Sequence, residues 1–473
     1  MKDIWKMSEA PLVRNVIPQE EKLTKQQAIL DKGLHLFSGK VNECYKVDTK
    51  LLLKDEDGAF GLMHRGTKES HPGWPVIIFE GTANEERTRI TDAARTILGQ
   101  PEALCFQFLT VEEIKKRMGI EDISEMEGLE VQVENEGYVE GLYWLPKEVA
   151  DEMKVYLAEV KEFEKVIHTY DGELSDKNAL PCAKKLYAYL KSVYGKKCLL
   201  AQQESFWRDG PEYEMRLLEE YTGKLPAIRG LDFIANTFED VVERAREWWN
   251  KGGIVTICWH TGPDFTSDYE VCIREEFDWT DAFVPGTKQY MHLVEGIDRA
   301  APYLKQLADE NIPVIWRPFH EFDGHWFWWS KGGAENFKKL WQMMYSRYTE
   351  YWGIHNLIWI LGYVNNPEDK AIWYPGDNYV DISGADNYDC LDGNVELYNA
   401  CAETVPEGMP LANHECGVIP REEEMKDAPW LYVMPWYNWI VGEENANTPE
   451  HLYKIYNSDY FITLDKLPNL REK

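Results

Sequence analysis

The stretch WRPFHEFDGHWFWWS, residues 316–330, gathers one arginine, two histidines, a glutamate, an aspartate and four tryptophans. A second stretch, PLANHECG at 410–417, repeats the His-Glu order with His414 and Glu415. Two carboxyl groups can cleave a glycoside when one stays protonated to expel the leaving oxygen and the other is ionised to attack or to activate water. Glu321 and Glu415 are therefore a candidate catalytic pair. Either one alone could instead be an ordinary strand-end carboxylate bound to Arg or Lys.

Arg317 lies four residues before the first glutamate, so in an extended strand its side chain points to the same face. A buried guanidinium near Glu415 would lower the pKa of that carboxyl and keep it ionised. The alternative is a structural ion pair between Arg317 and either Asp323 or Asp232. Asp386 is a further candidate anchor for this group of charges.

Three tryptophans follow Glu321 in the loop that would cover the site: Trp326, Trp328 and Trp329. The flat face of a pyranose ring packs on an indole, which supplies binding energy without charge. We expect Trp326, five residues after the glutamate, to be a sugar-binding platform. Trp328 and Trp329 fit either sugar contact or core packing.

Three histidines, His260, His320 and His414, fall near the two glutamates in this pattern. Together these groups could instead bind a divalent metal, as in barrel hydrolases that use His and carboxylate ligands. Such sites usually carry a His-x-His pair on the first strand, whereas AQQES at 201–205 contains no histidine. Two-carboxylate chemistry is therefore the preferred hypothesis.

These groups need a scaffold that brings distant strand ends together. Eight short apolar runs recur in the C-terminal two thirds, and their hydrophobicity is continuous, as in strands buried on both faces. The pattern predicts a parallel (β/α)8 TIM barrel, whose strands form the catalytic face at their carboxyl ends. The runs are CLLAQQES (198–205), LPAIRGLDF (225–233), GIVTICWH (253–260), IPVIWRPFHE (312–321), LIWILGY (357–363), VDISGADNY (380–388), PLANHECG (410–417) and WLYVMPWYNW (430–439).

The end of each run supplies the residues expected around the barrel mouth. Strands four and seven face each other, so Glu321 and Glu415 can approach the roughly 5–5.5 Å separation of a retaining pair. The strand-end residues are Trp259 and His260, His320 and Glu321, Asp386 and Tyr388, His414 and Glu415, and Trp436. Helices between the runs support the barrel: residues 236–253 offer Asn236 or Thr237 as N-cap and Gly252 as a stop.

The first third of the chain differs, since sixteen of the 19 tryptophans lie after residue 197. The polar stretch at 171–178, followed by Pro181 opening a helix, marks a boundary. We predict an α+β domain of unknown role at 1–175 and the barrel at 176–473. The expected elements are strands at 74–81, 102–109 and 129–133 and a helix at 147–169. Trp74 and Trp144 are available as stacking groups, although a packing domain is the preferred interpretation.

Composition argues against several classes of partner. The net charge of −31 repels phosphate backbones and anionic surfaces, so we expect no binding to nucleic acid or membrane. The start lacks the apolar core of a secretion signal. We expect a cytoplasmic monomer as the sequence stands, or a secreted one if a leader has been removed. The nine cysteines, odd in number and without metal-like spacing, predict reduced core thiols.

RPFHEFDGHWFWW, residues 317–329, closely resembles the fourth-strand motif of the β-mannanase family, glycoside hydrolase family 26, which reads Arg-Pro-x-His-Glu followed five residues later by Trp. WH at 259–260, PAIRGLDF, DISGADNY and the glutamate of NHECG agree with it, and the resemblance covers roughly residues 180–465. This sequence departs from the family at AQQES, where Gly-Gln is usual, around Glu415, and in the loosely aligned MPWYNW.

The resemblance implies a retaining barrel hydrolase with Glu321 as acid/base and Glu415 as nucleophile, and no metal or organic cofactor. His320 would orient the nucleophile or the sugar, and Tyr388 would steady the charge on Glu415. The residues implied to line the sugar subsites are His260, Trp326, Tyr388 and Trp436.

The family implies β-1,4-mannan, galactomannan or mannooligosaccharides as substrates of an endo-β-1,4-mannanase. The main alternative is the same mechanism on another β-glycan, a β-xylan or mixed-linkage β-glucan, because members of the family act on these too. A non-catalytic sugar-binding barrel and a metal-dependent barrel hydrolase are the remaining alternatives.

Overall fold

The computed structural model describes residues 14–30, 32, 35–36, 44–48, 59–67, 76–80, 130–132, 138–145, 147–207, 210–266, 269–365, 370–388, 393–437 and 447–472. These fall into two compact units, Arg14–Lys165 and Val166–Lys473. The predicted strand at 102–109 and Trp74 lie outside the described residues.

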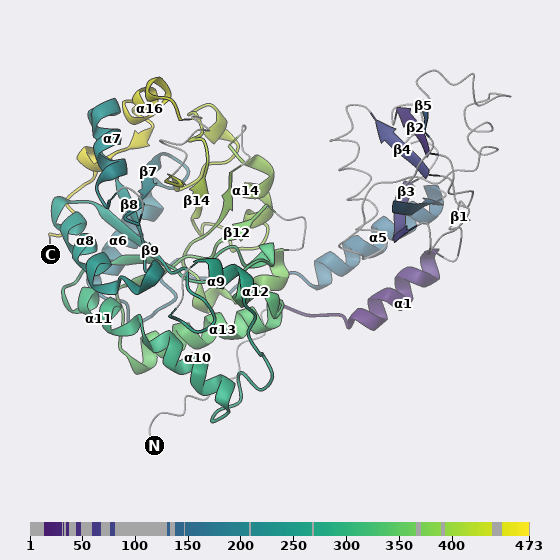
Figure 1. Cartoon of the computed structure of the whole chain (residues 1–473), viewed down its shortest axis with the longest axis horizontal. Coiled ribbons are helices and arrows are strands. Elements are labelled where there is room, and N and C mark those ends of the chain that lie inside the picture. Colours follow the sequence, from purple (N-terminus) through teal and green to yellow (C-terminus); the bar gives the residue numbers. More distant parts are fainter. Residues whose placement is uncertain are drawn as a thin grey trace. The chain divides into compact units, whose positions relative to one another are not determined.

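The described part of Arg14–Lys165 contains two helices and two small sheets (Figure 1). The helices are α1 (Gln19–Leu30) and α5 (Lys147–Phe163). In one sheet, β6 (Tyr138–Leu145), which contains Trp144, pairs antiparallel with β1 (His35–Leu36) and β3 (Ala59–Thr67). In the other, β2 (Cys44–Asp48) pairs in parallel with β4 (Val76–Glu80) and antiparallel with β5 (Glu130–Gln132).

Two of the predicted strands in this unit, at 74–81 and 129–133, contain β4 and β5. The helix predicted at 147–169 ends earlier, at Phe163. The chain turns at Glu164, and Val166 is already buried in the apolar core of the barrel unit. The apolar spacing therefore continued past the physical end of the helix.

The second unit is the predicted (β/α)8 barrel, and the eight apolar runs supply its strands (Figure 1). All neighbouring strands pair in parallel, in the order β11-β10-β9-β8-β7-β15-β14-β13-β12. β11 and β12 both come from the LIWILGY run and its next residue, so the ring closes through that run. The strands are β7 (Cys198–Gln203), β8 (Ile228–Asp232), β9 (Ile254–Cys258), β10 (Val314–Arg317), β11 (Leu357–Trp359), β12 (Tyr363–Val364), β13 (Ser383–Asn387), β14 (Leu411–Cys416) and β15 (Tyr432–Pro435), with β16 (Phe461–Ile462) added beside β7.

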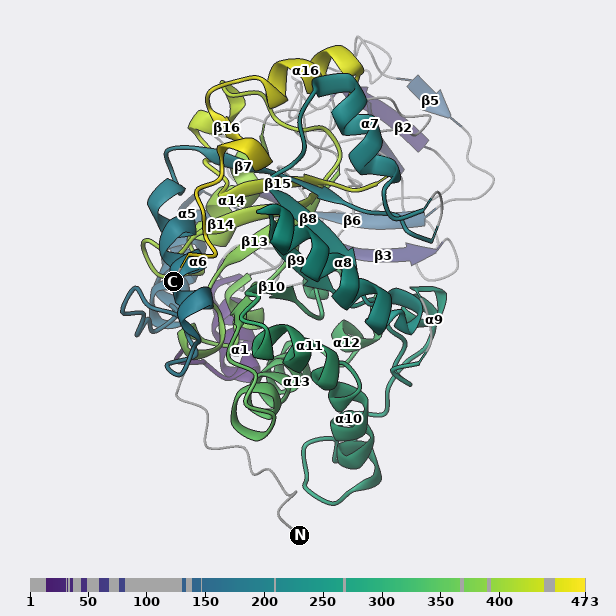
Figure 2. The ribbon, with the colours of Figure 1, turned by 90° about the vertical axis from the view of Figure 1, so that its left-hand side faces the viewer.

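Helices cover the outside of this barrel (Figure 2). α8 (Phe238–Lys251) follows Thr237 and ends at Gly252, whose φ of 104° is the left-handed conformation expected of a glycine stop. α6 (Pro181–Val193) opens with the predicted proline. The other helices are α7 (Tyr213–Thr222), α9 (Tyr269–Arg274), α10 (Lys288–Asp298), α11 (Ala301–Asp309), α12 (Trp328–Lys331), α13 (Ala334–Ser346), α14 (Val395–Ala402) and α16 (Pro449–Tyr456).

Short helical turns complete the connections: η2 (Ile234–Asn236), η3 (Phe322–Gly324), the π-helical η4 (Arg347–Tyr351), η5 (Lys370–Trp373), η6 (Asp377–Tyr379), η7 (Glu424–Lys426) and η8 (Leu464–Lys466). Among the described residues, no helix has both the length and the apolar character needed to cross a bilayer.

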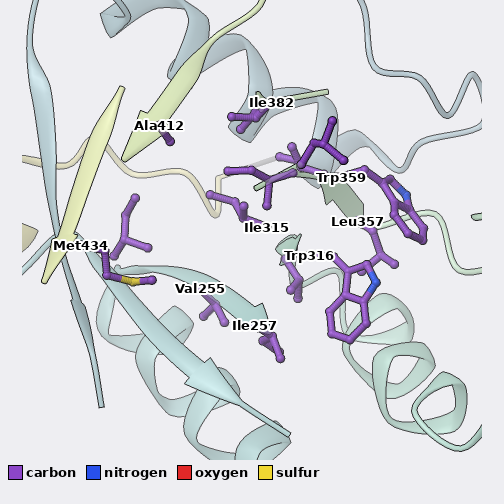
Figure 3. Close-up of a cluster of buried hydrophobic side chains, with 14 of the residues drawn as sticks. Val255, Ile257, Ile315, Trp316, Leu357, Trp359, Ile382, Ala412 and Met434 are labelled. Atoms are coloured by element: carbon purple, nitrogen blue, oxygen red, sulfur yellow. The ribbon is translucent and has the colours of Figure 1, made fainter. Parts of the chain in front are cut away.

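Strand and helix residues together make one apolar core, part of which Figure 3 shows. Val255 and Ile257 of β9, Trp316 of β10 and Trp359 of β11 are fully buried there. Burial of large apolar side chains contributes roughly 1.5–3 kcal/mol each. This core fixes the strands, and the strand ends then have defined positions at the mouth.

Candidate active site

The loop after β10 holds the first glutamate in a constrained backbone conformation. Phe319 (φ 49°) and Glu321 (φ 54°) both lie in the left-handed region, which costs roughly 1–2 kcal/mol for a residue with a side chain. The backbone N–H of Glu321 donates a 2.8 Å hydrogen bond to the carbonyl of Gly362. Strained residues of this kind concentrate at functional sites, where the surrounding contacts fix one geometry.

Gly362 allows the fifth run to approach two histidines of the site. A Cβ at this position would lie 2.5 Å from Cε1 of His414 and 3.3 Å from Cβ of His320. A side chain at this position would therefore displace the His414 ring and crowd Cβ of His320. The close approach at Gly362 also places the carbonyl that accepts from Glu321.

Arg317 is fully buried and joins two carboxylates. Its Nη2 donates to Oε1 of Glu415, and its Nη1 donates to Oδ2 of Asp386 at 3.0 Å. The hydroxyl of Tyr388 donates to Oε2 of Glu415. Each oxygen of Glu415 therefore accepts from a donor that favours its ionised form.

The alternative partners considered for Arg317 are engaged elsewhere. Asp323 lies 2.5 Å from the ammonium of Lys370, and Asp232 lies 2.5 Å from Nδ1 of His260. The structure thus pairs the arginine with the second glutamate of the predicted pair.

A line of polar groups connects Asp232 to Glu415. Nε2 of His260 lies 3.0 Å from Nε2 of His320, and the same His320 nitrogen is 3.6 Å from Oε1 of Glu415. Burial lowers the pKa of His320 well below its ordinary value, and the charge of Arg317 lowers it further, so this ring is neutral. Its Nδ1 is buried without a hydrogen-bond partner in the described chain. The proton is therefore favoured on Nε2, the nitrogen that faces His260 and Glu415.

His414 braces Asp386 from the other side. Its Nδ1 is hydrogen-bonded to Oδ1 of Asp386, and its Nε2 lies 3.3 Å from the carbonyl oxygen of Leu361. Asp386 is thus held between His414 and Arg317, the anchoring position expected for it.

Among the described residues, two trios of side chains bring possible metal ligands within 4.8 Å of one another: Asp232, Cys258 and His260, and His320, Asp386 and Glu415. His414, one of the three histidines of the metal hypothesis, belongs to neither trio. Within both trios the carboxylate oxygens already face histidine or arginine nitrogens. The arrangement fits a hydrogen-bonded carboxylate site.

The two glutamates differ in what surrounds them. Burial raises the pKa of Glu321 well above its ordinary value, and the charges of Glu415 and Asp386 add to this rise. Burial also raises the pKa of Glu415, but the Arg317 guanidinium opposes the rise. The indole N–H of Trp326 donates a 2.8 Å hydrogen bond to Oε2 of Glu321 without outweighing burial. The proton of the pair therefore resides on Glu321.

Aromatic rings line the mouth beside these carboxyl groups. The Trp436 ring centroid lies 6.0 Å from that of His260. Two further aromatics were missed by the sequence reasoning: Trp207, 6.2 Å from Trp436, and Tyr269, 5.4 Å from His260. They are 38% and 42% exposed. Trp207 follows the first strand by four residues, so examination of that strand's loop would have found it.

Trp259 corrects an expectation, because it does not face the mouth. It is 2% exposed, and its ring contacts Phe238 of α8 and Phe265 at centroid distances of 5.6 and 5.7 Å. Successive residues near a strand end point to opposite faces. Since His260 faces the site, its neighbour Trp259 faces the helix layer.

The three tryptophans after Glu321 divide between two roles. Trp328 and Trp329 are fully buried, and their indole N–H groups donate to the carbonyls of Thr261 and His320 at 2.8 and 2.9 Å. They are core residues that support the loop. Trp326 is 39% exposed at the mouth, as a sugar platform would be.

Comparison with known proteins places the barrel unit in a family. The sequence profile of Glycosyl hydrolase family 26 matches residues 175–466. A mannan endo-1,4-beta-mannosidase of Thermothelomyces thermophilus is 32% identical over 325 residues, 63% of this chain and 64% of the relative. Mannan endo-1,4-beta-mannosidase B of Piromyces sp is 32% identical over 313 residues, 63% of this chain and 54% of the relative. The chain thus spans between half and two thirds of these curated relatives.

Solved structures share the fold. A beta-mannanase from a symbiotic protist of the termite Reticulitermes speratus, complexed with gluco-manno-oligosaccharide, has a TM-score of 0.59 and 30% identity, covering 64% of this chain and 99% of that chain. A ruminal GH26 endo-beta-1,4-mannanase has a TM-score of 0.60 and 24% identity, covering 92% of this chain and 88% of that chain. The second likeness is one of fold, and it extends beyond the barrel.

Proposed function

The chain belongs to glycosyl hydrolase family 26, and on that premise we propose that it hydrolyses β-1,4-mannosidic linkages in mannan, galactomannan or mannooligosaccharides with retention of configuration. The proposal is carried by two neighbouring carboxyl groups in different states. Glu321 is buried, which raises its pKa, whereas Glu415 accepts hydrogen bonds from Arg317 and Tyr388. A retaining glycosidase needs these two states in one site. Relatives named as mannan endo-1,4-beta-mannosidases support mannan as the substrate.

In the first step, Glu321 gives its proton to the glycosidic oxygen while Glu415 attacks the anomeric carbon. The bond to the leaving sugar breaks, and a glycosyl ester forms on Glu415. In the second step, the Glu321 carboxylate takes a proton from water, and the resulting hydroxide displaces Glu415 from the anomeric carbon. Both carboxyl groups return to their starting states.

The surrounding groups fit this sequence of steps. Arg317 and Tyr388 hold Glu415 ionised before the attack, and the Nε2–H of His320 faces the same carboxylate. When Glu415 becomes an ester, its charge is lost, and Glu321 loses the larger of the two charges that raise its pKa, while that of Asp386 remains. Glu321 can then act as a base in the second step.

The barrel unit is the part to which we assign hydrolysis, because the family match at 175–466 and every side chain of the site lie within it. We propose that the preceding unit is an accessory domain.

The proposal is tested by incubating the protein with β-mannan, galactomannan, mannooligosaccharides, xylans and mixed-linkage β-glucan, with and without a chelator. We expect reducing ends to appear with mannans, with no effect of the chelator. Activity on xylan or mixed-linkage glucan alone would keep the mechanism and replace the substrate. Activity lost with chelator would move the histidines of the site into a metal centre.

A second experiment separates hydrolysis from mere sugar recognition. We expect Glu415→Ala to abolish turnover while the variant still binds mannooligosaccharide in calorimetry, because the nucleophile is lost but the subsites remain. Glu450→Ala, on the exposed start of α16, is the matched control and should keep full activity. Substantial turnover by Glu415→Ala would reject Glu415 as the nucleophile.

A further inference from the structure

The loop after β7 presents an exposed indole. Trp207 is 38% exposed, although it lies only four residues beyond the buried strand Cys198–Gln203. Its ring centroid lies 6.2 Å from that of Trp436, tilted by 38°, and 5.5 Å from that of Tyr437, edge to face. A large aromatic surface is thus held open to solvent beside other aromatics, the kind of surface that packs on a sugar ring.

The base beneath this indole is rigid. Phe206 packs edge to face against Trp207 at 5.2 Å, and the Arg244 guanidinium of α8 covers the Phe206 ring at 4.9 Å. Arg244 donates to Glu204 at 2.7 Å, and Arg229 of β8 pairs with the other oxygen of Glu204 at 2.7 Å. These three charged groups are buried, where breaking such a network is costly. The charges fix the backbone that carries Trp207.

Ser205, the residue after Glu204, is fixed as well. The backbone N–H of Ser205 donates to Oε2 of Glu214 at 3.2 Å, and its hydroxyl donates to the other oxygen. Glu214 belongs to α7, so the loop is tied to a helix as well as to the barrel. An indole held in this way loses little conformational entropy on binding a ligand.

A row of ring and polar contacts joins the exposed indole of Trp207 to the catalytic groups. Trp436 lies between Trp207 and His260, and the ring centroids of Trp436 and His260 are 6.0 Å apart. His260 in turn contacts His320, which lies beside Glu415. This row therefore starts at the nucleophile. Trp326, by contrast, is bonded to the acid Glu321. The two exposed indoles thus reach the catalytic pair through different contacts.

The acid protonates the oxygen of the leaving sugar, so Trp326 lies on the leaving-group side of the cleaved bond. From the row of rings that links Trp207 to the site, we infer that Trp207 forms a distal sugar subsite for a β-1,4-linked hexopyranosyl chain. This inference rests on the proposed hydrolysis and adds to it a residue that sets the preference for chain length. A substrate too short to reach Trp207 gains nothing from it.

The test measures kcat and KM of wild type and Trp207→Ala on β-1,4-mannooligosaccharides from the biose to the hexaose. We expect kcat/KM on the hexaose to fall about tenfold, mainly through KM. The shortest cleaved substrate should be unaffected, and the positions at which the hexaose is cut should shift. Trp207→Phe keeps a flat face and should recover most of the loss.

Tyr453→Ala, an exposed aromatic on α16, is the matched control and should change neither parameter. Thermal unfolding of each variant identifies a general loss of structure, and Trp207→Phe then carries the test. An equal effect on every chain length, or no effect on any, would overturn the inference while leaving the proposed function intact. If the wild type acts only on another β-glycan, the same series on that glycan tests Trp207 independently of the mannan assignment.

Discussion

The indole N–H of Trp326 donates a 2.8 Å hydrogen bond to Oε2 of Glu321, so the exposed tryptophan of the mouth is bonded directly to the carboxyl that we propose as proton donor. This bond favours the ionised carboxylate and lowers the pKa of Glu321, against the larger effect of burial. Trp326 therefore acts on the proton of Glu321, in addition to the sugar contact that we propose for it.

Trp326→Phe should move the alkaline limb of the kcat/KM profile to higher pH. Loss of the indole N–H raises the pKa of Glu321 further, so the acid stays protonated at higher pH. The measurement is the pH dependence of kcat/KM on mannohexaose. The control is Trp352→Phe. Trp352 precedes β11, away from the mouth, and its indole N–H donates a 2.8 Å hydrogen bond to Asp298. Loss of that bond should leave the profile unchanged. A downward movement of the limb in Trp326→Phe would contradict the assignment.

Arg317→Lys should move the acidic limb of the same profile to higher pH. Lysine keeps one charge but loses the two-way contact with Glu415 and Asp386. The pKa of Glu415 then rises, and the nucleophile becomes protonated at a higher pH than in the wild type. We expect kcat/KM at the optimum to fall about 10- to 100-fold, the size of one charge-assisted hydrogen bond of roughly 1.5–3 kcal/mol.

The control for that variant is Arg347→Lys, because Arg347 donates to both oxygens of Asp298 away from the mouth. Its pH profile should match that of the wild type. An acidic limb in Arg317→Lys that stays in place would show that Arg317 does not control Glu415.

Glu321→Ala should lose activity on mannooligosaccharides by about 10²–10⁴-fold, the usual contribution of a general acid. An aryl β-mannoside with a good leaving group needs no proton to depart, so its first step should be spared. We expect a burst of the phenol followed by a slow phase, in which the missing base delays hydrolysis of the ester on Glu415. Equal losses on both substrates without a burst would exclude Glu321 as the acid/base.

Lys370→Ala should destabilise the barrel by about 3–5 kcal/mol, because Asp323 would remain buried without its 2.5 Å partner. Urea unfolding followed by tryptophan fluorescence measures this in the barrel unit. Lys305→Ala, which breaks an exposed pair with Asp309, should cost only about 0–1 kcal/mol. Similar losses for the two variants would show that the buried pair has no special weight.

The sequence reasoning about strand ends contains one correct contact and one error. Arg317 does meet Glu415 as predicted, although β10 ends at Arg317 and the backbone from there to Glu321 is not an extended strand. Period-two alternation places Trp259 opposite His260, and Trp259 indeed packs against Phe238. The prediction assigned both Trp259 and His260 to the mouth, although adjacent residues of a strand face opposite sides.

The sequence by itself determined the eight barrel strands, the carboxyl groups at the ends of two of them, and the tryptophan five residues after Glu321. These features follow from local patterns: continuous apolar runs, glycine and proline stops, and a motif of adjacent residues. The tertiary structure decided which groups meet. Arg317 binds Asp386 and Glu415, which are 69 and 98 residues away along the chain.

The left-handed backbone at Phe319 and Glu321 and the close approach at Gly362 were also decided by the tertiary structure. Both depend on contacts between the fourth and fifth runs, whose positions are fixed only when the ring of strands closes. The exposed face of Trp207 depends in the same way on the buried network of Glu204 and Arg244. Local sequence patterns therefore predict the strands and the candidate residues, whereas distances, burial and charge pairing arise from long-range packing.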